Sequence, residues 1–141
     1  MHIEIFSSQT GVSLGVTQQL DFKDIIQNQH CTNPIVLRFV PDQEASVSNL
    51  KIYLENKGVS KNSNFFFATS SMFFPNIESG SDVFAPFIEM PGVDSTIAPY
   101  GYTIDPVVIP NGSSSDYVWL DVQSLKQTGV NRPNFRLFFD T

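Results

Sequence analysis

Residues 50–55 read Leu-Lys-Ile-Tyr-Leu-Glu and hold the clearest alternation of apolar and polar side chains in the chain. In an extended segment, Leu50, Ile52 and Leu54 fall on one face, and the residues that alternate with them fall on the other. A period of two predicts a β-strand with one buried and one exposed face.

The same kind of pattern recurs along the chain, and clusters of Gly, Pro, Asn, Asp and Ser separate the segments. We predict strands over residues 35–40, 50–55, 117–122 and 135–139, with weaker ones over 2–6, 12–20, 64–69, 83–89 and 102–109. Helical periodicity is confined to residues 21–27 and to one turn over 122–127. A parallel sheet would require strands that alternate with helices along the chain, and the sequence lacks this pattern. We therefore expect an all-β antiparallel sandwich, immunoglobulin-like or jelly-roll, of about seven to nine strands.

Length and composition indicate one folded domain. The chain of 141 residues suits a single domain over residues 1–141, with a long loop or arm around residues 70–101. Aromatic residues make up 13% and charged residues only 16%, which excludes an intrinsically disordered chain.

The charge balance is acidic. Fourteen acidic and eight basic residues give a net charge of −6, and the basic residues are scattered singly. This excludes the basic face that nucleic-acid binding or an anionic membrane surface requires. The first residues lack the features of a signal peptide, and no apolar run is long enough to span a bilayer, so we expect synthesis in a cytoplasm.

Residues that could carry chemistry are few. One cysteine and two histidines cannot supply a structural zinc site or an internal disulfide. His30 and Cys31 are adjacent, and neighbouring side chains of an extended chain point to opposite faces, so we expect Cys31 to be an apolar filler rather than a nucleophile. No nucleophile elbow or phosphate-binding loop is present. We predict no enzyme activity, no cofactor and no metal.

The 13 phenylalanines are more informative. Consecutive strand residues alternate faces, so the runs at 65–67 and 73–74 cannot all enter one core. We predict a partner-binding surface that comprises Phe65, Phe66, Phe67, Phe73, Phe74 and Tyr100. One alternative is a carbohydrate-binding platform of Tyr102, Tyr117 and Trp119, which requires an exposed tryptophan. Another is that a long loop covers one sheet and buries both of its faces.

The C-terminal segment has a distinctive layout. Ile109-Pro110-Asn111-Gly112-Ser113 is followed by Tyr-Val-Trp-Leu-Asp-Val at 117–122, a turn at Gly129, and a last strand at 135–139. This layout resembles small immunoglobulin-like or jelly-roll sandwich proteins of bacteriophage particles, which include capsid decoration, auxiliary and tail accessory proteins. The resemblance implies a structural virion protein that docks on other virion proteins, either the major capsid protein or a tail component. It leaves open whether the partner belongs to the capsid or to the tail, and whether the protein is a monomer or a homo-oligomer such as a trimer. A carbohydrate-binding module is the alternative function.

Overall fold

The computed structural model describes residues 1–16, 19–21, 25–26, 28–53, 63–78, 87–89, 102–124, 130–131, 134–136 and 138–140. Every strand pairing within these residues is antiparallel, and none of these residues lies in a helix. The predicted all-β antiparallel class is therefore confirmed. Over the same residues, there is no apolar helix of membrane-spanning length.

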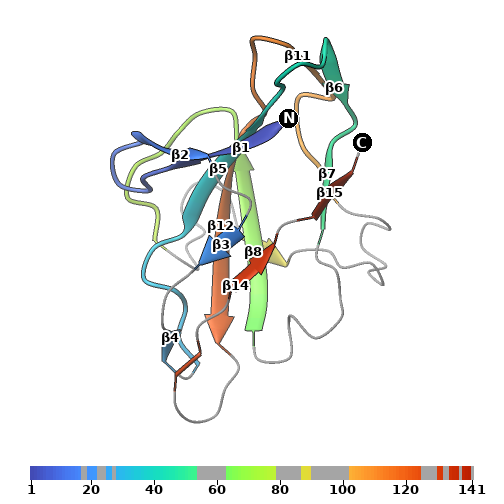
Figure 1. Ribbon diagram of the computed structural model, residues 1–141. Coiled ribbons are helices and arrows are strands. Elements are labelled where there is room, and N and C mark those ends of the chain that lie inside the picture. The colour runs from blue at the N-terminus through green and yellow to red at the C-terminus, as the bar shows by residue number, and fades with distance from the viewer. Residues whose placement is uncertain are drawn as a thin grey trace.

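A six-stranded sheet forms the centre of the molecule (Figure 1). Its strands, in spatial order, are β2 (Ser13–Val16), β1 (His2–Phe6), β5 (Ile35–Val40), β12 (Tyr117–Ser124), β8 (Ser63–Ser70) and β9 (Ile88–Glu89). The long strands β12 and β8 pair over their whole length, from Tyr117 opposite Ser70 to Ser124 opposite Ser63. They are rich in Phe, Val, Trp and Leu, which suit a pleated surface.

Four smaller sheets complete the described strands. They are β10 (Tyr102–Thr103) with β7 (Lys51–Tyr53) and β15 (Phe138–Asp140), β11 (Val108–Pro110) with β6 (Ser46–Ser48), β13 (Val130–Asn131) with β4 (Ile25–Ile26), and β14 (Asn134–Arg136) with β3 (Gln19–Asp21).

The observed strand boundaries explain where the predictions succeed and fail. Strands β1 and β5 match the predicted segments 2–6 and 35–40. The predicted strand over 102–109 is divided around Pro106, which follows a cis peptide bond and cannot donate to a ladder. The helix predicted over 21–27 is wrong at its described residues, because Asp21 ends β3 and Ile25 and Ile26 form β4; residues 22–24 and 27 lie outside the described residues. The turn predicted over 122–127 is also wrong at its start, where residues 122–124 continue β12.

The first face of the central sheet carries the main hydrophobic core. Alternate residues of β12, namely Val118, Leu120 and Val122, are fully or almost fully buried there. The smaller sheets and their connections supply the opposite side of the same core, through Val47, Leu50, Ile52, Ile104 and Ile109. The period-two pattern at residues 50–55 thus has the expected origin where the structure describes it: Leu50 and Ile52 pack inward.

The second face of the central sheet is buried as well. Phe6, Val36 and Trp119 form its core, and the packed residues include Phe73, Phe74 and Ile77 of segment 71–78, together with Phe87 and Tyr117. The Asn76 amide donates to the Ser8 carbonyl over 2.9 Å and ties this segment to the β1–β2 turn. A covering segment therefore buries this face around Phe6 and Trp119, in agreement with the alternative that a loop packs over one sheet and buries both of its faces there.

Candidate interaction sites

The predicted partner-binding residues do not form one surface. Phe65 and Phe67 are only 3% and 1% exposed and belong to the main core. Phe66 alternates to the other face and lies near His30, with ring centroids 6.0 Å apart. Phe73 and Phe74 belong to the second core. The prediction is corrected for Phe65, Phe67, Phe73 and Phe74, because they pack in the two cores of the sheet; Phe66 is half-buried, and Tyr100 lies outside the described residues.

The predicted carbohydrate platform is occupied by protein. Trp119 is completely buried, and its ring stacks on Phe73 with centroids 6.0 Å apart and planes at 25°. Tyr117 packs edge-on against Phe73 and Phe6, at centroid distances of 5.7 and 5.3 Å. The side chain of Tyr102 lies outside the described part of the chain. Because Trp119 has no exposed face, the requirement for an exposed tryptophan is contradicted and this platform is corrected.

Exposed apolar side chains lie instead on β2, the outermost strand of the central sheet, and at Val12 just before it. Val12, Leu14 and Val16 are 61%, 67% and 67% exposed. Among the described strands, β2 pairs only with β1. Ile5 pairs with Gly15 while Phe6 pairs with Ser13, so Leu14 is the extra residue of a β-bulge. An open edge with such side chains is a natural attachment point for another strand.

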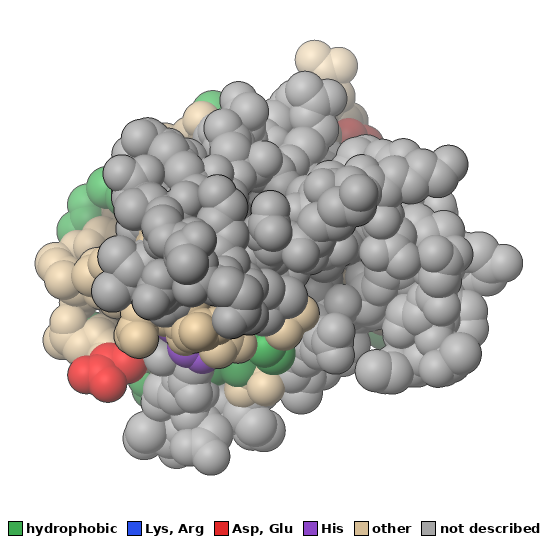
Figure 2. Space-filling view, turned by 90° about the horizontal axis from the view of Figure 1, so that it is seen from below, with side chains coloured by type: hydrophobic (Ala, Val, Ile, Leu, Met, Phe, Trp, Pro, Cys, Tyr) green, Lys and Arg blue, Asp and Glu red, His purple; other side chains and the backbone are tan. Residues whose placement is uncertain are grey.

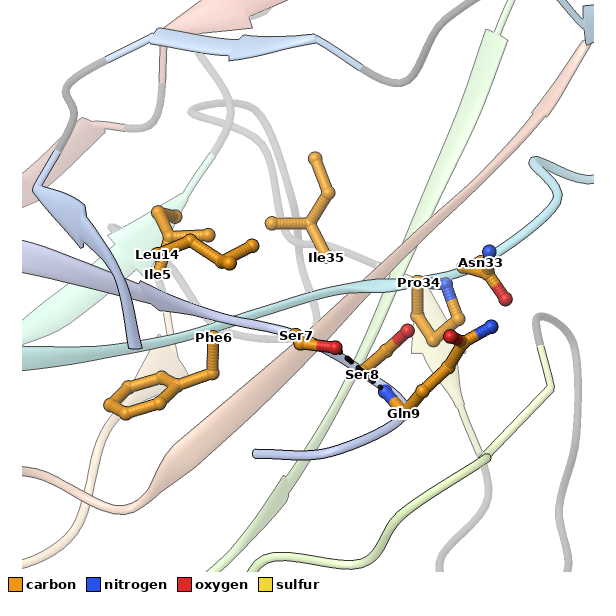
Figure 3. Close-up of a pocket in the computed structure, with 9 residues that line it drawn as sticks. All are labelled: Ile5, Phe6, Ser7, Ser8, Gln9, Leu14, Asn33, Pro34 and Ile35. Atoms are coloured by element: carbon orange, nitrogen blue, oxygen red, sulfur yellow. Dashed lines mark hydrogen bonds between the residues drawn. The ribbon is translucent and has the colours of Figure 1, made fainter. Parts of the chain in front are cut away.

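A pocket of about 270 Å³ lies beside this edge (Figure 3). Figure 3 shows Leu14, Ile5 and Ile35 on one side of the strands, with Phe6 on the other. Ser7, Gln9 and Asn33 add polar atoms to the lining, and the Ser7 hydroxyl accepts a hydrogen bond from the Gln9 amide over 3.3 Å. The pocket can therefore take an apolar side chain whose backbone stays at the polar rim.

A buried carboxylate organises a second, chemically different cluster. Asp121 is fully buried, and its Oδ2 lies 2.7 Å from His30 Nδ1. The Cys31 thiol donates to the other oxygen of Asp121 over 3.4 Å. His30 is about one-third exposed, and Figure 2, viewed from below, shows a histidine at the surface beside hydrophobic side chains. Cys31 is buried in the main core, as expected for an apolar filler, while His30 lies near Phe66 on the other face; both side chains nevertheless reach Asp121, through different oxygens.

Sequence patterns did not reveal this cluster, because Asp121 lies 91 residues from His30 along the chain. The one available signal was a carboxylate inside the apolar run at 117–122, on the same strand face as Trp119. Such a carboxylate can orient the imidazole and set which ring nitrogen carries the proton. Within the described ranges, no three His, Cys, Asp or Glu residues gather as metal ligands.

Charged groups gather around Met1, at the start of β1. The Met1 amino group lies 2.6 Å from Glu44 and 2.9 Å from Asp42, and Asp42 also contacts His2. The hydrogen bond from the amino group lowers the pKa of Glu44 to about 2 and also lowers the pKa of Asp42. The two carboxylates in turn raise the pKa of the amino group. Burial, with a smaller contribution from Asp105, raises the pKa of Asp116.

No family model, no curated protein and no solved structure matches this chain. Its function is therefore inferred from the geometry of these sites.

Proposed function

We propose that this chain is a structural docking module, which joins a partner protein through the open β2 edge of its central sheet. The observation that carries the proposal is the group of three apolar side chains, each at least 61% exposed, on an outermost strand and at the residue just before it. Exposed apolar side chains that lie close together mark interaction sites, whereas singly scattered ones do not. The docking surface thus lies at Val12, Leu14 and Val16, and not at the phenylalanines for which it was predicted from the sequence.

The composition of this edge supports attachment. Residues 11–16 read Gly-Val-Ser-Leu-Gly-Val and hold no charge and no proline, although the chain carries a net charge of −6. Lysine and proline are the residues that commonly protect edge strands against pairing. An extended segment of a partner would pair its backbone with β2 and place one side chain in the pocket beside Leu14.

Within this class, we propose an accessory protein of a bacteriophage particle that docks on a capsid or tail protein. Two features support it: the layout of residues 109–139, which resembles such proteins, and an attachment edge suited to a component added to a larger assembly. A carbohydrate platform at Tyr102, Tyr117 and Trp119 requires an exposed Trp119 ring, and Trp119 is fully buried.

Selection of peptides on the purified protein tests the docking edge. A random-peptide library is panned on the wild-type chain, and the enriched peptides are then measured against Leu14→Lys and Met72→Lys. Both positions are exposed, at 67% and 65%, so the two variants are matched in charge and in burial. We expect extended apolar peptides whose binding is lost with Leu14→Lys and kept with Met72→Lys. Equal binding to both variants, or no enrichment, would contradict the proposal.

A further inference from the structure

The described residues cover the second face of the central sheet over only part of its length. Segment 71–78 packs over Phe6 and Trp119, whereas His2, Glu4, Arg38 and Val40 near the start of β1 are only half-buried by the described part of the chain. His2 pairs with Val40 and Glu4 pairs with Arg38, so these four side chains lie on this face at this end. Together with the turn at residues 111–114, they line a pocket of about 330 Å³.

Arg38 is held in place from three sides. Its Nε donates to Glu4 over 3.0 Å, and its Nη1 donates to the Tyr117 hydroxyl over 3.4 Å. Its guanidinium carbon also lies 4.9 Å from the centre of the Phe6 ring and 5.3 Å from that of Tyr117. A guanidinium carries five N–H donors, so this arrangement leaves further donors at the pocket wall with little conformational freedom to lose.

The facing wall is a turn that is also fixed. The Asn111 side-chain amide donates to the carbonyls of Asp42 and Glu44, over 2.8 and 2.9 Å. Gly112 has a φ of +88°, and the Ser113 amide closes the turn by donating to Pro110 over 3.0 Å. Ser113 and Ser114 of this turn line the pocket, and a serine hydroxyl can both donate and accept a hydrogen bond.

The charges in the pocket are largely balanced. Glu4 forms an ion pair with Arg38, and Asp42 contacts His2, so the lining has no excess positive charge for an anion. The lining contains both hydrogen-bond donors and acceptors, and Val40 and Pro41 add apolar surface. A pyranose presents the same combination of hydroxyls and C–H groups, and it fits a pocket of this size.

We infer that this pocket binds a neutral sugar residue. The site shares no lining residue with the pocket beside β2, and it is distinct from the buried Trp119 platform. It does not depend on the proposed docking function.

Titration of the ¹⁵N-labelled protein with single sugars tests the inference by NMR. The probes are glucose, galactose, mannose and N-acetylglucosamine at up to about 50 mM, because a few hydrogen bonds give millimolar affinity. We expect at least one sugar to shift the amides of Gly112, Ser113 and Ser114 and the Nε–H of Arg38. Ser113→Ala should weaken that sugar about fivefold through one lost neutral hydrogen bond. Arg38→Lys should weaken it by more than about tenfold, since the fork geometry is lost.

Ser71→Ala is the matched control, because Ser71 is also an exposed serine but lies outside the pocket. It should leave the affinity unchanged. Ser113 lies on an exposed turn, so its variant reports on binding even if Arg38→Lys disturbs the fold. Absence of shifts at residues 111–114 with every sugar would overturn the inference. Shifts there with inorganic phosphate but with no sugar would also overturn it, in favour of an anion site.

Discussion

Replacement of Phe73 by alanine distinguishes a buried cover from a free contact residue. Phe73 stacks on Trp119 at 6.0 Å and packs edge-on against Tyr117 at 5.7 Å. If segment 71–78 is part of the folded core, the loss of this ring should destabilise the protein. If Phe73 were a surface contact for a partner, the same change would leave the isolated protein as stable as before.

The expected loss follows from burial and ring geometry. Truncation of a fully buried phenylalanine costs about 3–5 kcal/mol, and Phe73 is partly exposed, so about 2 kcal/mol is expected from burial. Two favourable ring contacts add about 0.5 kcal/mol each. The sum is about 3 kcal/mol, which lowers the urea midpoint by about 1.5 M for a domain of this size.

Urea unfolding followed by fluorescence measures this change directly, because Trp119 is the only tryptophan in the chain. The folded wild type should emit in the blue, and Phe73→Ala should shift the emission to the red as water reaches the indole. Met72→Ala is the control, since Met72 is the preceding residue and is 65% exposed. A Phe73→Ala midpoint within about 0.2 M of the wild type would refute a structural role for the covering segment.

Three further changes probe other contacts. Asp121→Ala should lower the free energy of unfolding by about 2 kcal/mol in urea titrations, because it leaves His30 without its carboxylate partner; Asp121→Asn should cost less. Gly11→Ala should cost about 1–2 kcal/mol and lower the melting temperature, because φ is +75° and the new methyl would lie 3.0 Å from Phe73. The pKa of Glu44 is lowered from 4.5 to about 2, so the carboxylate stabilises the fold above about pH 4.5 and this contribution is lost as the pH falls toward 2. Glu44→Gln should therefore flatten the acid limb of stability against pH, and an unchanged limb would exclude this contribution.

The candidate sites differ in how far local sequence could reveal them. The exposed edge at β2 was predicted only as a weak strand over 12–20, because a short apolar run does not show whether its neighbours cover it. The pocket at Arg38 joins β1, β5 and a turn more than 70 residues further along the chain, and only pairing in the sheet brings them together. The Asp121–His30 contact depends in the same way on a fold that places residues 28–31 beside the end of β12.

The amino-acid sequence alone determined the antiparallel all-β class. It also determined which side chains of β7 and β12 face inward, such as Ile52 and Leu120. It could do so because side chains alternate with a period of two, which is a local property of an extended chain. Only the tertiary structure decided whether the opposite faces meet water. Trp119 and Tyr117 alternate away from the main core, and they are covered because segment 71–78 folds back over the sheet and packs Phe73 against both rings. That outcome depends on packing between distant segments, and the same alternation would also suit an exposed aromatic surface.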